Sequence, residues 1–540
     1  MKHKSISQRQ KRLDKFWILG GLLCVLLASI MAWDINRHFV GLHSWGDAHG
    51  PWHARVQVKY GLGYTKGLYT WAVGDPPTEN PSRYLDHPQL PNLLNAAFMA
   101  ALGVNRWALR VENLIATIIT LFLFLKILQR LLDEKTALLA GLFFCSSPLI
   151  GYFGAGGWLY PFAFMSIWCY LVVIGALAKG PQPSKWHKFG LAVGLFFALQ
   201  MSWEGFFFAL AIGVHYVFRC VRNRRLFDVK LFAILAIAPL SSLALDFLVL
   251  TAARGWDFQE LIEIYKWRAG PAEVGEHDWF KWFATLWEYA VTNFSLPVMI
   301  IGVCYLTIGQ SFMFAQETTR TKRPSRKLRQ FWLLVMPAVF QLLILKGCLW
   351  KHQTWERPFL LIVPVAAALG ILLLADLLAK VRPILAKIST AALIVIAIVG
   401  CARGLNHYYS INHFSPAKVK LFTMLNERIP PDKALLGTAF PFEGLIVNQH
   451  KAKGTHYRPE VAWYLDREIV PARTFEEVRQ KAETGRYPYY LIPYYEKLAP
   501  LINQLRRHYR FEPIKRDPGA PGKAPMLPYL VFDLAGPASP

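Results

Sequence analysis

The sequence predicts a mainly α-helical protein that crosses a membrane many times and ends in a small α/β domain. Hydrophobic residues make up 54% of the 540 residues, and they are concentrated in runs near the 20 or so residues that a helix needs to cross a bilayer. The net charge of +25 comes from short Lys and Arg clusters between these runs. No basic face interleaved with aromatic residues is visible, so we expect the lipid bilayer and not nucleic acid as a partner.

Eleven apolar runs are candidates for membrane spans, and alternate connections between them are basic. The runs cover residues 16–33, 107–126, 136–153, 158–178, 187–203, 205–219, 229–251, 295–315, 330–347, 358–379 and 387–405. The positive-inside rule places the basic connections in the cytoplasm. We therefore expect a multi-pass protein of the cell (inner or plasma) membrane, with the N-terminus inside and everything after Cys401 outside. The first run lacks a clear cleavage site, which favours an anchor over a signal peptide.

Two domains are expected, a membrane domain at 1–411 and a soluble outer α/β domain at 412–540. Residues 34–106 and 252–294 read as long outer loops. In the tail, Ser415-Pro416 predicts a helix start, Thr474-x-x-Glu477 is a capping box and Gly485 is a C-cap. The segments "KALLGTA", "YPYYLIP" and "MLPYLVFDL" predict strands.

The stretch "HSWGDAHGPWHARVQVKYG" at 43–61 places many titratable side chains directly after the first span. Asp47 is the only carboxylate between Asp34 and Asp75, and a plain helix-capping role in a solvated loop is the alternative to a catalytic one. His49 and His53 are spaced for one face of a helix, where they and Asp47 could bind a divalent ion. Gly50-Pro51 argues against a continuous helix there, so a metal is not favoured and no cofactor is expected.

Two segments resemble a known enzyme group. The stretch "DHPQLPNLLNAAFMAALGVNRWALRVENLIATIITLFLF" from Asp86 and the stretch "KTALLAGLFFCSSPLIGYF" from Lys135 resemble the GT-C glycosyltransferases that use polyprenyl-phosphate sugars. This group contains the protein O-mannosyltransferases and the aminoarabinose transferases of lipid A. The resemblance implies a GT-C-like bundle of about 11 spans. It also implies inverting transfer of a sugar from a polyprenyl-phosphate donor to a hydroxyl of a protein, lipid or glycan at the outer face.

The resemblance also implies roles for single residues. An acidic residue soon after the first span lies at the reaction centre of the group, and Asp47 matches it as the catalytic base. Cations must steady the departing phosphate, and "LWKHQTWERPFLLIVP" at 349–364 supplies Lys351, His352 and Arg357. His87 stands where relatives place His or Lys before Pro-x-Leu, and Arg268 comes from the second long loop. Interfacial snorkelling is the alternative for Lys351, and an ion pair with Glu356 is the alternative for Arg357.

The chain departs from the group at "GAGGWLYPF" (154–162), where relatives often carry an acidic residue and this sequence has Tyr160. Glu204, between the fifth and sixth runs, is a candidate for the missing acid, and an ion pair with a neighbouring cation is the alternative. His49, His53, Tyr60 and Trp45 are the further candidates for substrate binding, since aromatic rings stack on sugars. A transporter or flippase of a lipid-linked sugar is the rival function. Charges clustered at the outer face and unequal loops argue against it.

Overall fold

The computed structural model describes residues 2–84, 87–180, 182–255, 259, 262, 266, 279–309, 326–345, 353–411, 413–438, 458–494, 496–514 and 529–537. The chain divides into two compact units. The first, here the membrane unit, comprises 1–35, 86–91 and 110–407, and the second, here the head unit, comprises 36–85, 92–109 and 408–540. The loop after the first apolar run thus belongs to the same unit as the C-terminal tail.

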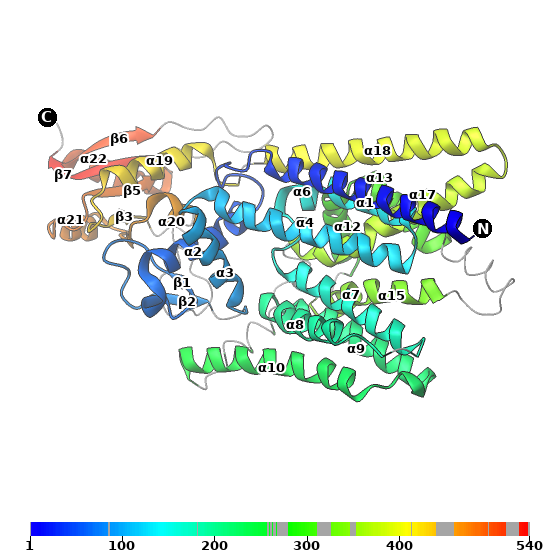
Figure 1. The fold of residues 1–540 in the computed structure, drawn as a ribbon. Helices are drawn as coiled ribbons and strands as arrows, with labels where there is room; N and C mark the ends of the chain where they lie inside the picture. Colours follow the sequence, from blue (N-terminus) through cyan, green and yellow to red (C-terminus); the bar gives the residue numbers. More distant parts are fainter. Residues whose placement is uncertain are drawn as a thin grey trace. The chain divides into compact units, whose positions relative to one another are not determined.

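The membrane unit is built of helices (Figure 1). They are α1 (Lys2–Ala32), α4 (Arg106–Leu131, whose first turn belongs to the head unit), α5 (Glu134–Ser146), α6 (Pro148–Phe153), α7 (Leu159–Leu177), α8 (Lys185–Met201), α9 (Gly205–Arg222), α10 (Val229–Arg254), α12 (Trp279–Phe294), α13 (Leu296–Cys304), α15 (Arg326–Ile344), α17 (Val363–Ala379) and α18 (Pro383–Ser410). Short helical turns occur at η1 (Arg224–Leu226), η2 (Tyr305–Gly309) and η3 (Gln353–Leu361).

All eleven predicted runs form helix in their described parts, which confirms the predicted fold class. Within the described ranges, seven helices are long and apolar enough to cross a membrane, or eight if one bent pair forms a single span. The count of eleven spans stays a prediction. Helix α8 packs between α7 and α10, and α17 packs against α5 and α13.

Two local predictions in the membrane unit were wrong. The run 136–153 is split into α5 and α6, because Pro148 has no N–H to continue the helix and Ser147 adopts an extended ψ of 127°. Residues 279–294, predicted as part of a loop, form α12, which meets α13 at a bend of 114°. Its apolar residues follow helical spacing without forming a continuous run.

The head unit contains a five-stranded sheet and helices from both parts of the chain. The first loop supplies α2 (Ser44–Thr65), α3 (Leu90–Leu102) and the hairpin of β1 (Tyr69–Trp71) with β2 (Ser82–Tyr84). The tail supplies α19 (Pro416–Arg428), α20 (Pro459–Leu465), α21 (Phe475–Ala482), η4 (Glu496–Leu498) and α22 (Ala499–His508). Its sheet has the order β4-β3-β5-β7-β6, formed by β3 (Leu435–Gly437), β4 (Ile469–Pro471), β5 (Tyr489–Pro493), β6 (Tyr509–Ile514) and β7 (Tyr529–Pro537).

The predicted helix starts and strands of the tail are confirmed. Ser415 caps α19 by accepting from the Lys418 N–H, and Thr474 caps α21 by accepting from the Glu477 N–H. The C-cap of α21 is Glu483 and not the predicted Gly485; Gly485 lies two residues later with a positive φ of 66°, which a glycine adopts without strain. The three predicted strands are β3, β5 and β7. Strands β3 and β4 pair in parallel, as do β3 and β5, whereas β7 runs antiparallel to β5 and β6.

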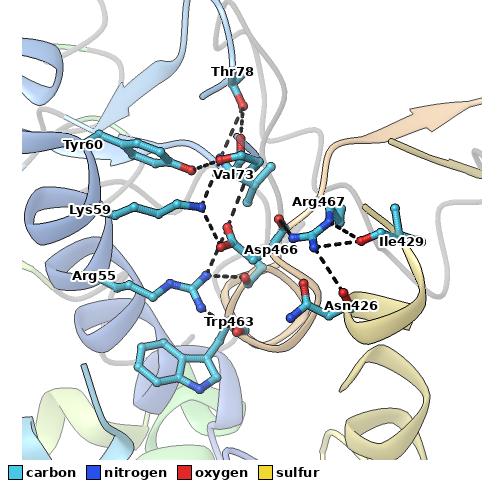
Figure 2. Close-up of polar contacts among 12 residues, drawn as sticks. Arg55, Lys59, Tyr60, Val73, Thr78, Asn426, Ile429, Trp463, Asp466 and Arg467 are labelled. Atoms are coloured by element: carbon cyan, nitrogen blue, oxygen red, sulfur yellow. Dashed lines mark hydrogen bonds and ion pairs between the residues drawn. The ribbon is translucent and has the colours of Figure 1, made fainter. Parts of the chain in front are cut away.

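Polar contacts join α2 to the tail (Figure 2). The Asp466 carboxylate lies 2.8 Å from Lys59 Nζ and 3.5 Å from Arg55 Nη2. Arg467 donates to the carbonyl oxygens of Ile429 and Asn426 at 2.8 Å and 3.1 Å. Helices α2 and α19 also share a core that includes the buried rings of Trp52 and Phe422. The first loop and the tail therefore form one packed body.

The expectation that Gly50-Pro51 would interrupt a helix was wrong. Helix α2 continues through Pro51, and its one non-helical residue is Gly61. Proline at this position removes one backbone hydrogen bond. The face that contains Ala48, Trp52 and Val56 is buried in the core of the head unit, and this packing offsets the lost bond.

Candidate functional site

Asp47 lies in the first turn of α2 and faces a cation. Its Oδ2 is 3.8 Å from Arg37 Nη2, and the side chains of Asp47 and Arg37 are 17% and 9% exposed. Arg37 also donates to the Tyr409 hydroxyl at 3.4 Å and lies 5.2 Å from the centre of that ring. A carboxylate beside a guanidinium and at a helix N-terminus is stabilised in its ionised form, which can accept a proton.

The other sequence candidates on α2 are packed into the head unit. The His49 ring stacks on Trp45 and Tyr69, with ring centres 4.7 Å and 5.6 Å apart, and burial lowers the pKa of His49 to about 3. His53 is fully buried and its Nδ1 lies 2.9 Å from the Thr70 carbonyl oxygen. The Tyr60 hydroxyl donates to the Gly74 carbonyl oxygen, and burial raises the pKa of Tyr60.

In the membrane unit a second group of polar side chains comes together around Arg357 of η3. Glu204 precedes α9 and is 4% exposed, while Tyr160 in the first turn of α7 is 1% exposed. Electrostatic interactions connect Tyr160 with both Glu204 and Arg357. Burial raises the pKa of the Glu204 carboxyl, and the Arg357 guanidinium opposes this change. We call Tyr160, Glu204 and Arg357, together with Gly156, the Arg357 cluster.

Three buried atoms of this cluster have no hydrogen-bond partner within the described part of the chain. They are the Tyr160 hydroxyl, Glu204 Oε2 and Arg357 Nε. Buried polar atoms are nearly always hydrogen-bonded, since leaving one unsatisfied costs about 1–3 kcal/mol. Three such atoms in one cluster form a set of donors and acceptors that a bound molecule could satisfy.

A glycine-rich loop brings its backbone against the Arg357 side chain. Gly154, Gly156 and Gly157, between α6 and α7, have φ values of 72°, 77° and 62°, which residues with a side chain rarely adopt. A Cβ on Gly156 would lie 3.0 Å from Arg357 Nη1 and 3.2 Å from its Cδ. The loop is also anchored to α4, where the Ala155 N–H donates to Thr117 Oγ1 at 3.0 Å. The unusual "GAGG" run therefore makes room for Arg357.

The membrane unit also contains an apolar groove. It has a volume of about 420 Å³ and is lined by residues of α13, η2, α15, η3 and α17, among them Met299, Leu306, Trp332, Phe359 and Val363. Phe359 is two residues from Arg357, or about 4 Å along a 3₁₀ helix. The same helical turn thus supplies a cation to the Arg357 cluster and an apolar side chain to the groove.

The remaining candidates are only partly described. His87 is partly exposed in the membrane unit, and its carbonyl oxygen accepts from Gln89 Nε2 at 2.7 Å. Lys351, His352 and Arg268 lie outside the described residues, as does the side chain of Glu356. Within the described ranges no group of three or more His, Cys, Asp or Glu side chains could hold a metal ion.

Sequence reasoning did not identify Arg37, the unsatisfied Tyr160 hydroxyl or the groove. Arg37 is visible as a cation ten residues before Asp47, but only the fold shows that the two side chains meet. The glycine run before Tyr160 was a usable signal, because several glycines in a short connection indicate a close backbone approach. The groove comes from helices distant in sequence and has no local signal.

Comparisons with known proteins agree with this fold. A family model described as dolichyl-phosphate-mannose-protein mannosyltransferase matches residues 86–243. No curated protein matches the sequence. The structure of ArnT from Cupriavidus metallidurans bound to undecaprenyl phosphate is similar with a TM-score of 0.58 at 11% identity, over 97% of this chain and 98% of that chain.

Two further solved structures are similar. ArnT from the same organism in the apo state has a TM-score of 0.57 at 11% identity and covers 98% of this chain and 100% of that chain. The apo oligosaccharyltransferase of Archaeoglobus fulgidus has a TM-score of 0.54 at 11% identity, over 92% of this chain and 74% of that chain. The resemblance seen in the sequence is thus confirmed, and the chain is a multi-pass membrane protein with the GT-C fold of these glycosyltransferases.

Proposed function

We propose that this protein is an inverting glycosyltransferase that moves a sugar from a polyprenyl-phosphate donor to a hydroxyl acceptor at the outer face of the membrane. The observation that carries the proposal is Arg357, a cation whose Nε has no hydrogen-bond partner among the described residues and whose helical turn η3 also supplies Phe359 to an apolar groove. A lipid with a phosphate head group has the two matching parts. The fold and the matched family support the same reaction class.

Arg357 would bind the phosphate while the groove holds the first part of the lipid chain. A guanidinium can make two parallel hydrogen bonds to a phosphate, which a lysine cannot. The groove is almost entirely apolar, so the hydrocarbon gains contacts there without the loss of any hydrogen bond. We propose Lys351, His352, His87 and Arg268 as further cations around the same phosphate, because its charge grows as it departs.

Asp47 would act as the general base. It takes the proton of the acceptor hydroxyl while that oxygen bonds to the anomeric carbon of the sugar from the side opposite the phosphate. The bond from this carbon to the phosphate oxygen breaks at the same time, and polyprenyl phosphate leaves with the bonding electrons. Arg37, 3.8 Å from Asp47, would keep the carboxylate ionised before the reaction.

The two units and the charges support the proposed placement of Asp47 at the outer face. The first loop and the tail share one compact unit, which supports placing both on one side of the membrane. The basic connections favour the other side as cytoplasmic. We therefore propose that 1–411 forms a catalytic domain of the cell membrane and that 412–540 forms an outer domain, to which α2 is joined. Glu204, His49, His53, Tyr60 and Trp45 remain the proposed contributors to substrate binding.

Binding of undecaprenyl phosphate to the purified protein in detergent tests the phosphate role. We expect Arg357→Ala to weaken binding about ten-fold or more and Arg357→Lys to weaken it less, since a hydrogen bond to a charged group contributes about 1.5–3 kcal/mol. Arg382→Ala is the matched control, because Arg382 is an exposed arginine just beyond the opposite end of α17. Unchanged affinity with an earlier melting temperature for Arg357→Ala would show that Arg357 serves stability only.

A further inference from the structure

The unsatisfied atoms of the Arg357 cluster differ in hydrogen-bonding character. Arg357 Nε can only donate, and an ionised Glu204 Oε2 can only accept, whereas the Tyr160 hydroxyl can do both. A bare phosphate accepts hydrogen bonds and carries negative charge, so it satisfies Arg357 and Tyr160 but not an ionised Glu204. A molecule that carries anionic oxygens and a hydroxyl group close together satisfies all three.

We infer that Glu204 binds a hydroxyl of the transferred sugar, while Tyr160 donates to a phosphate oxygen beside Arg357. This inference rests on the proposed function and names the group that binds the sugar in the same site. Glu204 thereby supplies the acid that the sequence lacks at 154–162, from a different connection of the membrane unit.

The packing of Tyr160 supports a ligand-directed hydroxyl. The ring packs edge-on against Phe164 and Phe208, with ring centres 5.8 Å apart in both pairs. These contacts explain the position of the ring, but they do not provide a hydrogen bond to the hydroxyl. Since that hydroxyl is buried without a hydrogen-bond partner among the described residues, it is available to a bound molecule.

The charge of Glu204 should affect binding of the bare lipid phosphate and of its sugar ester in opposite directions. The Arg357 guanidinium favours the ionised form of Glu204, and an ionised carboxylate repels a phosphate, so Glu204 does not bind the bare lipid phosphate. Replacing Glu204 by Gln removes the repulsion and keeps the shape, but it turns a charge-assisted hydrogen bond to the sugar into a weaker neutral one. Leu at this position removes the acceptor altogether.

The test compares the affinity of the full-length protein in detergent for undecaprenyl phosphate and for undecaprenyl phosphate esterified with mannose, glucose, galactose or arabinose. We expect at least one sugar ester to bind wild type more tightly than the bare lipid. Glu204→Gln should reduce this preference about five- to ten-fold and Glu204→Leu should reduce it further, while the bare lipid binds as in wild type or more tightly. Tyr160→Phe should weaken the bare lipid and the esters by the same factor.

Asp246→Asn is the matched control. Asp246 is another buried carboxylate of the membrane unit, and it is outside the Arg357 cluster. One of its oxygens lies 3.1 Å from Gln200 Nε2, and the other has no hydrogen-bond partner among the described residues. It should leave the sugar preference unchanged. No sugar preference in wild type, or an unchanged preference in Glu204→Leu that still melts like wild type, would overturn the inference. Arg357→Ala that binds undecaprenyl phosphate normally would instead overturn the proposed function.

Discussion

Asp47 is the residue on which the proposed chemistry depends most directly. Asn keeps the size and hydrogen bonding of Asp47 but cannot accept a proton. We expect Asp47→Asn to lower turnover about 100-fold or more while donor affinity stays near that of wild type. The exposed Asp34, from the same connection, is the control, and Asp34→Asn should remain active. Near-normal turnover by purified Asp47→Asn would rule out its role as the base.

His49 should make the stability of the head unit depend on pH. Burial lowers its pKa to about 3, whereas an unfolded histidine titrates near 6.5. The unfolded state therefore binds more protons between these values, and the free energy of unfolding falls as the pH drops below about 6.5, by at most about 1.4 kcal/mol per pH unit. His49→Phe keeps the stacked rings and should reduce the loss of melting temperature between pH 7.5 and 5.5. An identical pH dependence in both proteins would contradict this.

Gly156 should be intolerant of a side chain. Alanine there would be strained at a φ of 77° and would place a Cβ 3.0 Å from Arg357 Nη1. We expect Gly156→Ala to weaken undecaprenyl phosphate binding, because the guanidinium must move. Gly213→Ala is the control, since a Cβ at this helical glycine meets nothing within 4 Å, and it should bind normally. Equal binding by both variants would show that the loop does not position Arg357.

Helix α2 is contacted by residues near both ends of helix α20. Ser44 donates to Glu460 at 2.9 Å near the start of α20, and Lys59 lies 2.8 Å from Asp466 just after its end. The Glu460 side chain is fully buried and also pairs with Arg458 at 2.9 Å. These contacts span much of the length of α2, so the tail fixes the helix on which Asp47 lies.

Loss of the Asp466 contacts should destabilise the head unit. Asp466 is 18% exposed and pairs with two cations, so we expect Asp466→Asn to cost about 1–3 kcal/mol and to speed amide hydrogen exchange in α2. The exposed pair of Arg428 and Glu512 is the control, and Glu512→Gln should cost less than about 1 kcal/mol. Equal exchange in α2 for wild type and Asp466→Asn would contradict the role given to α20.

Sequence signals predicted those elements that depend on neighbouring residues. The caps at Ser415 and Thr474 are satisfied by backbone groups three residues away, and apolar runs reveal spans because lipid surrounds them. Helix α2 was missed because packing with the distant tail outweighs Pro51. Helix α12 was missed because its apolar residues are spaced rather than continuous. Such elements depend on tertiary contacts that the local sequence does not contain.

The same limit applied to the candidate site. Asp47 and Arg357 were predicted by resemblance, and the structure assigns them to different units, the head unit and the membrane unit. Their roles stay predictions. Arg37, Tyr160 and the apolar groove could not be predicted, since each depends on a neighbour far away in the chain.

The topology of the whole molecule can be tested with reporters. If the basic connections face the cytoplasm, a periplasmic or extracellular reporter fused after Ser410 should be active and one fused near Arg323 should be inactive. A cytoplasmic reporter should show the reverse pattern. Activity of the external reporter at Arg323 would show that the head unit, and Asp47 with it, lies on the cytoplasmic side.

The central claim is that the protein catalyses sugar transfer from a lipid phosphate. The most direct measurement adds purified protein to detergent-solubilised membranes of cells that lack the gene, and follows lipid-linked sugars by mass spectrometry. In detergent there are no two membrane faces, so a flippase would change nothing. We predict that wild type converts an accumulated polyprenyl-phosphate sugar to bare polyprenyl phosphate and a glycosylated acceptor, and that Asp47→Asn does not. An unchanged donor with wild type, or equal conversion by Asp47→Asn, would contradict the account.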